Sequence, residues 1–314
     1  MIKLPYNILR LIRPRQWIKN FAIFAAIVFS GELFNFPLLE KVILSFIVFC
    51  GLSSATYIIN DIFDVESDRM HPFKKFRPLA HRDVPIPVAQ VFAGVLMISS
   101  LTLAFYVTPA FFVLALVYIF LQFLYSTFLK TITVLDILTI AAGYILRVYA
   151  GEFATGLHIS VWLLLTTISF SLFIAIGKRR SELTLVSERT GGNIAATRKT
   201  LSHYSERLLD VYASVFATGT FVSYSLFTFL EEPRHINLPE GFIFPEFLPT
   251  FFQRKWLMIT IIPVVYILMR YLQDIYEKRE GESPEKVLLS DKPLLTTVII
   301  WGILVVLIIY FIGA

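Results

Sequence analysis

The chain has 314 residues, of which 56% are hydrophobic and only 16% are charged. A soluble domain carries about a quarter charged residues, so this composition excludes an ordinary soluble globular protein. The formal net charge of +5 is small for a nucleic-acid-binding protein, and the single cysteine, Cys50, excludes a disulfide framework and a thiolate metal site.

Apolar segments of membrane-spanning length recur along the whole chain. A helix needs about 20 mostly apolar residues to cross a hydrocarbon core of ~30 Å. We therefore predict an all-α fold, a polytopic membrane bundle of about nine transmembrane helices that forms one domain over residues 1–314. The predicted spans lie near residues 20–36, 42–60, 86–107, 110–129, 132–150, 159–177, 208–230, 255–273 and 293–313.

Lysine and arginine are distributed unevenly between these spans. The N-terminal segment and the loops at 61–85 and 178–207 are rich in basic residues, whereas the long loop at 231–254 has few. Basic loops are retained on the cytoplasmic side of a membrane. We therefore predict a multi-pass protein of the cell (inner) membrane, with its N-terminus and both basic loops in the cytoplasm.

Acidic side chains gather where the second predicted span ends. On a helix, Asn60, Asp64 and Asp68 stack at successive i, i+4 positions, and Asp61 lies within the same arc. Carboxylates crowded on one face repel one another unless a cation lies among them, and oxygen ligands suit Mg²⁺. We predict that Asn60, Asp64 and Asp68 bind Mg²⁺, and that Asp61, Asp64 and Asp68 are the catalytic acids. The alternative is a solvated helix end in which acids and bases neutralise one another.

Basic side chains follow this acidic group directly. Arg69, Lys74, Lys75 and Arg77 lie within the next few residues, together with His71. Fixed cations beside a carboxylate-bound metal ion stabilise a departing diphosphate. We predict that Arg69, Lys74, Lys75 and Arg77 bind substrate phosphates. His71 could also bind phosphate, and the alternative is a structural role, which is more common for a lone histidine.

These residues carry a resemblance to a known family. The string NDIFDVESDRMHPFKKFRPLA at 60–80 resembles the first aspartate-rich motif of the UbiA superfamily of intramembrane prenyltransferases. Its basic extension is similar to that of the decaprenyl-phosphate phosphoribosyltransferases in this superfamily. Four further strings resemble the same subfamily: RPRQWIKNF at 13–21, LRVYAGEFATG at 146–156, GKRRSEL at 177–183 and SPEKVLLSDKPLL at 283–295.

The resemblance implies a reaction. Such an enzyme transfers 5-phosphoribosyl from phosphoribosyl diphosphate to a polyprenyl phosphate and releases diphosphate, with Mg²⁺ as cofactor. An aromatic-acceptor prenyltransferase of the UbiA type is the first alternative, and it predicts a second aspartate-rich motif after the sixth span. A transporter is the second alternative, and it predicts repeated halves with broken helices near the middle of the membrane.

The loop after the sixth span departs from the usual UbiA pattern. Lys178, Arg179 and Arg180 stand where a second acidic motif is expected. Additional substrate phosphates favour such an exchange, so we predict that Lys178 and Arg179 bind substrate, with Glu182 and the N-terminal Lys19. The alternative is that these cations anchor the end of the span, which we favour for Arg180.

Two charged residues lie inside the fifth predicted span. Asp136, near the start of the fifth span, reaches the active site or makes a structural hydrogen bond. Arg147 lies on the same helix, and an intramembrane arginine is a candidate for substrate contact by default. The alternative is that its side chain extends to the membrane surface at the outer end of the span. For Asp136 and for Arg147, both alternatives stay open at this point.

Overall fold

A computed structural model describes residues 3–70, 74–189, 203–230, 255–278 and 284–312. The predicted motif residues 71–73, part of the basic loop at 178–207 and the loop at 231–254 lie outside this description. Within the described ranges every regular element is a helix, which confirms the predicted all-α fold.

Eight helices in the described part of the chain are long and apolar enough to cross a membrane. They are α3 (Phe36–Phe63), α5 (Ile86–Val107), α6 (Pro109–Thr127), α7 (Leu135–Thr155), α8 (Val161–Arg189), α9 (Glu206–Leu230), the stretch Trp256–Glu277 around α11 (Ile261–Gln273), and Lys292–Ile312, which begins with α13 (Lys292–Leu307). The predicted number of about nine is therefore not confirmed.

The predicted span at 20–36 accounts for the difference. It is divided between a 3₁₀-helix, η1 (Pro14–Phe24), and the short helix α2 (Ala25–Phe29), after which Gly31 turns the chain with a φ of +75°. Neither piece has the length of a membrane-spanning α-helix. Together they pack between α3 and α7, inside the bundle.

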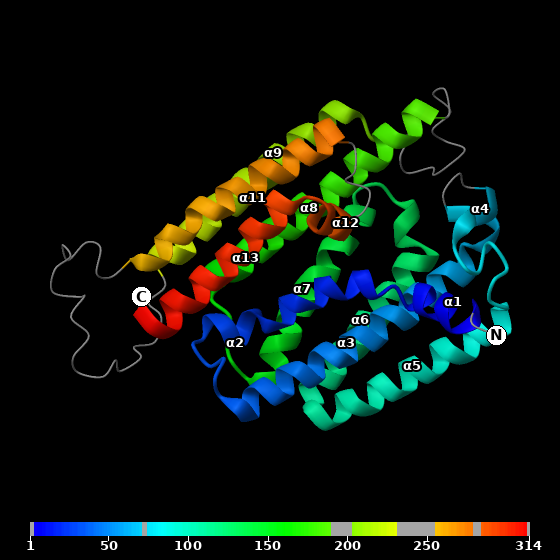
Figure 1. The fold of residues 1–314 in the computed structure, drawn as a ribbon, viewed down its shortest axis with the longest axis horizontal. Coiled ribbons are helices and arrows are strands. Elements are labelled where there is room, and N and C mark those ends of the chain that lie inside the picture. The colour runs from blue at the N-terminus through cyan, green and yellow to red at the C-terminus, as the bar shows by residue number, and fades with distance from the viewer. Residues whose placement is uncertain (1–2, 71–73, 190–202, 231–254, 279–283, 313–314) are drawn as a thin grey trace.

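Shorter helical segments precede, connect or extend the long helices. They are α1 (Lys3–Ile12), α4 (Val65–Met70), η2 (Lys74–Phe76), η3 (Leu129–Thr131), η7 (Trp256–Thr260), η8 (Asp274–Lys278), α12 (Pro284–Ser290) and η9 (Ile308–Ile312). In Figure 1, α8, α9, α11 and α13 run together along one side, and α3, α5 and α6 form the other. The N-terminus lies beside α1, and the C-terminus lies at the opposite end of the view.

Local sequence explains where several helices begin. Pro109 occupies the first turn of α6, and the Thr108 hydroxyl accepts a hydrogen bond from the backbone N–H of Phe111. The Asp291 carboxylate caps α13 in the same way through the N–H of Leu294. Both patterns satisfy backbone donors that a helix otherwise leaves without partners.

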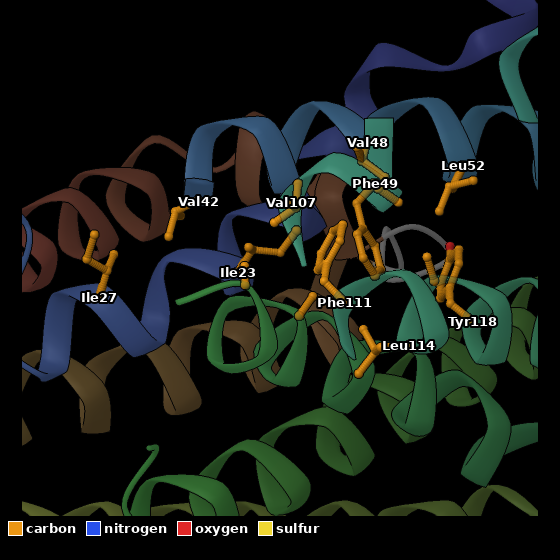
Figure 2. Packing of buried hydrophobic residues seen from close by; sticks show 14 residues of the cluster. Ile23, Ile27, Val42, Val48, Phe49, Leu52, Val107, Phe111, Leu114 and Tyr118 are labelled. Carbon is orange, nitrogen blue, oxygen red and sulfur yellow. The ribbon is translucent and has the colours of Figure 1, made fainter. Parts of the chain in front are cut away.

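The largest buried cluster joins η1 and α2 to α3, α6 and α7 (Figure 2). The ring of Phe49 lies 5.9 Å from that of Phe111 and 5.0 Å from that of Tyr118, measured between centroids. A Cβ added to Gly151 on α7 would lie 2.0 Å from the backbone oxygen of Ile23. Glycine therefore permits the close approach of η1 to α7, as small residues do between membrane helices.

Candidate active site

The predicted acidic motif lies where α3 passes into α4. Only Asp64 separates the two helices, and the N–H of Asp68 donates to the backbone oxygen of Asp64 at 2.8 Å. The Asn60 amide donates to Asp64 Oδ2 at 3.0 Å, and Lys130 Nζ, from η3, donates to Asp64 Oδ1 at 2.6 Å. Asn60 Oδ1 is buried and has no hydrogen-bond partner among the residues that the structure describes. Asn60 and Asp64 thus share one face, with a free oxygen beside the carboxylate.

The other two aspartates are bound by arginine. Arg13 Nη2 lies 2.6 Å from both carboxylate oxygens of Asp61, whose side chain is only 2% exposed. Arg77 Nη1 bridges Asp61 Oδ1 at 3.0 Å and Asp68 Oδ2 at 2.6 Å. Burial raises the pKa of Asp68, and the Arg77 guanidinium opposes that rise. We call these seven residues the Asp64 cluster: Arg13, Asn60, Asp61, Asp64, Asp68, Arg77 and Lys130.

The backbone of Arg13 is unusual. This residue precedes η1 and has a φ of +52°, in the left-handed region that few non-glycine residues adopt. Strained backbone of this kind persists where surrounding contacts hold it, and it is frequent at functional sites. The contact with Asp61 is such a restraint.

Three further predicted cations lie outside this cluster. Arg69 pairs with Glu66 on α4, with Nη1 2.8 Å from the carboxylate. Lys74 is half-buried in η2, and Lys75 is exposed with its ammonium 5.2 Å from the centre of the Phe76 ring. Their predicted contacts with substrate phosphates stay predictions.

Whether these residues suit Mg²⁺ depends on how many of its oxygen ligands come from the substrate. In the described residues, no three His, Cys, Asp or Glu side chains are grouped closely enough to form a ready-made metal site. Mg²⁺ commonly takes one or two protein carboxylates and completes its shell with water and substrate phosphate oxygens. The Asp64 carboxylate and the Asn60 Oδ1 fit an ion bound in that shared way. Asp68, the third predicted ligand, pairs with Arg77, and its contact with a metal ion stays a prediction.

The predicted group on α8 is internal. The Arg179 side chain is 0% exposed, and its Nε lies 2.7 Å from Asp136 Oδ2. Arg179 also forms an ion pair with Glu182 and donates to the Tyr125 hydroxyl at 3.1 Å. Tyr204 donates to the second oxygen of Asp136 at 2.8 Å. We call Tyr125, Asp136, Arg179, Glu182 and Tyr204 the Arg179 cluster; it gives Asp136 a structural role.

Lys19 lies in a separate charged group between η1 and α12. Its ammonium lies 3.2 Å from Glu285 Oε2, and Gln16 accepts from Lys19 and donates to Glu285. Burial alone would raise the pKa of Glu285, but Lys19, with help from Lys178, outweighs it and lowers that pKa. Lys19 and Glu285 border an otherwise largely apolar cavity of about 390 Å³, whose lining also includes Tyr224 and Trp301.

Arg147 is also internal and does not extend to the membrane surface. Its guanidinium donates to Asn20 Oδ1 at 2.7 Å, to the Gly143 backbone oxygen at 2.5 Å and to the Tyr118 hydroxyl at 3.0 Å. These contacts join η1 to α6 and α7. They give Arg147 a structural role as well.

Several residues of these sites are not among the predicted set. Arg13 and Gln16 lie in the string at 13–21 and Glu285 lies in the string at 283–295, so the family resemblance held a signal for all three. Lys130 had no signal beyond its position between two spans. Its contact with Asp64 joins residues 66 positions apart, which no local pattern reveals.

Comparisons with known proteins agree with this architecture. The UbiA prenyltransferase family matches residues 20–290. Decaprenyl-phosphate phosphoribosyltransferase from Mycolicibacterium smegmatis is 36% identical over 94% of this chain and 90% of its own length. The enzyme of that name from Corynebacterium glutamicum is 34% identical over 97% of this chain and 87% of its own length.

Solved structures show the same fold. The structure of a UbiA homolog from Archaeoglobus fulgidus bound to GPP and Mg²⁺ aligns with a TM-score of 0.66 and 18% identity, over 96% of this chain and all of that one. A structure of digeranylgeranylglyceryl phosphate synthase aligns with a TM-score of 0.63, over 98% of this chain and 100% of that one. With its eight apolar helices in the described residues, the chain is a polytopic membrane protein that belongs to the UbiA prenyltransferase family.

Proposed function

We propose that this enzyme transfers 5-phosphoribosyl from phosphoribosyl diphosphate to a polyprenyl phosphate and releases diphosphate. The Asp64 cluster is the observation that carries the proposal, because it combines metal-binding oxygens with three cations at one end of the bundle. The similarity to proteins named decaprenyl-phosphate phosphoribosyltransferase extends over nearly the whole chain and supports the same reaction.

The donor diphosphate binds at the Asp64 cluster in this proposal. Asn60 Oδ1 and the Asp64 carboxylate would hold Mg²⁺, which supplies positive charge to the leaving diphosphate. Lys130 and Arg77 are half-buried, with 20% and 26% of their side chains exposed, so they can also reach a ligand. Arg13 and Arg77 neutralise Asp61 and Asp68, so those carboxylates do not repel the incoming phosphates.

The chemistry needs little from the protein beyond positioning and charge. The bond between the anomeric carbon and the diphosphate oxygen breaks, positive charge develops at that carbon, and an oxygen of the lipid phosphate forms the new bond. The nucleophile is already an anion near neutral pH, so no general base is required. Fixed cations and a defined approach then account for catalysis.

In this proposal the protein lies in the cell (inner) membrane, and its active site faces the cytoplasm. Support comes from the basic N-terminal segment and the basic loops at 61–85 and 178–207, which such a topology places inside. The N-terminus beside α1 would then also be cytoplasmic. Phosphoribosyl diphosphate is a charged, water-soluble donor and requires this access.

Labelled donor tests the proposal directly. Purified protein in detergent is incubated with labelled phosphoribosyl diphosphate and a polyprenyl phosphate, and the lipids are extracted. Label in the organic phase is expected; its loss with EDTA and return with Mg²⁺ would establish the metal requirement. Product formed only from a prenyl diphosphate and an aromatic acceptor would instead show the aromatic-acceptor prenyltransferase.

A further inference from the structure

The apolar cavity has a distinct charged end. Apolar side chains such as Phe170 and Leu163 line most of it, whereas Lys19, Tyr144, Tyr271 and Glu285 bring polar atoms to its lining. Pockets of 300–1,000 Å³ typically hold a small molecule, and this one, at about 390 Å³, lies within that range. Its chemistry matches an amphiphile with an anionic head and a hydrocarbon tail.

The 3₁₀ geometry of η1 connects this cavity to the Asp64 cluster. Side chains three residues apart eclipse one another in such a helix, so Gln16, Lys19 and Ala22 form one row. Lys19 and Ala22 line the cavity, and Arg13, one further step back, binds Asp61. At ~2.0 Å per residue, Lys19 lies about 12 Å along η1 from Arg13. One element therefore presents both charged sites.

Tyr271 supplies an independent sign of a ligand. Its side chain lines the cavity and the residue is 3% exposed, yet within the described ranges its hydroxyl is buried without a hydrogen-bond partner. Buried polar atoms are nearly always hydrogen-bonded, because leaving one unpaired is costly. Gly177 makes room for this ring, since a Cβ there would lie 3.2 Å from the hydroxyl oxygen. The packing keeps a free donor at the charged end of the cavity.

The buried guanidinium of Arg147, close to this charged end, has no carboxylate partner among the described residues. Arg147 is 4% exposed, and its hydrogen bonds go to neutral groups on Asn20, Gly143 and Tyr118. Lys19 has Glu285 as its carboxylate partner. Among the described residues, Glu285 is thus the one carboxylate that pairs with either of these two cations, and an uncompensated buried charge is unfavourable. An anionic ligand would correct that imbalance.

We propose that the phosphate of an isoprenoid monophosphate binds between Lys19 and Tyr271, with its tail in the apolar cavity, and replaces Glu285 as the partner of Lys19. This assignment rests on the proposed function, since it gives the acceptor lipid its own headgroup site. The Glu285 carboxylate holds Lys19 in place until the lipid arrives. The Glu285 carboxylate also repels the phosphate and therefore limits the affinity for the lipid. Lipids without an anionic headgroup cannot displace Glu285 from Lys19 and are excluded.

Binding of a short probe tests the site without turnover. Farnesyl phosphate is titrated onto the full chain in detergent, with farnesol as the uncharged comparison, and affinity is read from the shift in melting temperature. Lys19→Met should weaken farnesyl phosphate binding roughly tenfold to hundredfold, the effect of losing a charge-assisted hydrogen bond. Tyr271→Phe should weaken it about twofold to tenfold, as for a neutral hydrogen bond. Farnesol binding should not change.

Two more variants separate the assignment from a structural role for the same residues. Glu285→Gln should tighten farnesyl phosphate binding several-fold, because repulsion is removed and Lys19 is released. If the pair of Lys19 and Glu285 only held α12 against η1, Glu285→Gln would weaken that contact without any gain in affinity for farnesyl phosphate. Lys41→Met is the matched control, since Lys41 is an exposed lysine near the start of α3, at the end of this helix opposite to Asp64. Lys19→Arg, which keeps the charge, should retain most of the binding if Lys19→Met does not fold.

Kinetics with both substrates complete the test. Lys19→Met should raise the KM for polyprenyl phosphate and leave the KM for phosphoribosyl diphosphate unchanged. Unchanged farnesyl phosphate binding in Lys19→Met and Tyr271→Phe, or a change only in the donor KM, would overturn the headgroup site. Lys19-dependent binding without any phosphoribosyl transfer would instead contradict the proposed function and leave the lipid phosphate site in place.

Discussion

The Asp64 cluster and the Arg179 cluster are both built from paired acids and bases near the ends of membrane helices, yet they differ in access. Asp64 and Lys130 keep 27% and 20% of their side chains exposed, and Asn60 Oδ1 has no hydrogen-bond partner in the described part of the chain. Arg179 and Asp136 are both 0% exposed, and Arg179 has partners on three sides. The difference favours the Asp64 cluster as the ligand-binding site and the Arg179 cluster as a stabilising contact within the fold, and substrate binding by Arg179 and Glu182 stays a prediction.

The largest expected effect is on stability, in the Arg179 cluster. Arg179→Ala leaves Asp136 and Glu182 without their buried cation, and breaking a buried ion pair costs about 3–5 kcal/mol. We expect a large fall in the melting temperature of the protein in detergent. If the melting temperature were unchanged while the KM of either substrate rose, Arg179 would be a substrate-binding cation, as its position in the sequence had suggested.

A nearly as large effect is expected on catalysis in the Asp64 cluster. Asp64→Asn removes the charge that is proposed to hold Mg²⁺, at a position that is 27% exposed, so kcat should fall by about 10²–10³, as for loss of other transition-state charge stabilisation. The melting temperature should change little. Glu66→Gln is the matched control, because the Glu66 side chain is 80% exposed on the neighbouring helix. Equal losses in both variants would remove the distinction between Asp64 and a solvated helix end.

Arg77→Lys tests the bridge within the same cluster. A single guanidinium nitrogen contacts both Asp61 and Asp68, and an ammonium group does not reproduce the geometry of an arginine fork. We expect a roughly tenfold rise in the KM for phosphoribosyl diphosphate, from a cost of about 1.4 kcal/mol. Steady-state kinetics with the donor varied at several Mg²⁺ concentrations measures it. A change confined to the lipid KM would contradict the donor assignment.

The smallest effect is expected at Arg180, next in sequence to Arg179. Arg180 pairs with Glu206 and Asp210 on α9, whose side chains are 49% and 38% exposed. Exposed ion pairs contribute about 0.2–1 kcal/mol, so Arg180→Ala should lower stability by no more than that, and less at high salt. Thermal unfolding at two salt concentrations measures it. A loss of stability as large as that in Arg179→Ala would show that burial does not explain the different contributions of Arg179 and Arg180.

Most of the fold could be predicted because its signals are local. Each long apolar segment satisfies its own backbone as a helix, and this is nearly the only choice in a bilayer. The segment at 14–29 is the exception, since its basic residues and its tight packing against Gly151 produce η1 and α2 instead of a span. That outcome depends on α7, which is far away in the chain.

The candidate site was predictable only in part, for a similar reason. The spacing of Asn60 and Asp64 on one helix predicts that they meet, and their side chains do. Nothing local predicts that Arg13 binds Asp61 or that Lys130 binds Asp64, because these pairs are 48 and 66 residues apart. The basic string GKRRSEL and the acidic string NDIFDVESD are both dense in charge, and sequence alone could not show which would be buried.

The sequence by itself determined the membrane environment, the helical fold, the acidic motif and the family resemblance, since composition and short-range spacing encode all four. The tertiary structure alone decided which charges are accessible, which are neutralised inside the bundle, and that Lys19 meets Glu285 beside an apolar cavity. The physical reason is that burial and ion pairing depend on distant segments. A charge acquires its role only from the neighbours that packing brings to it.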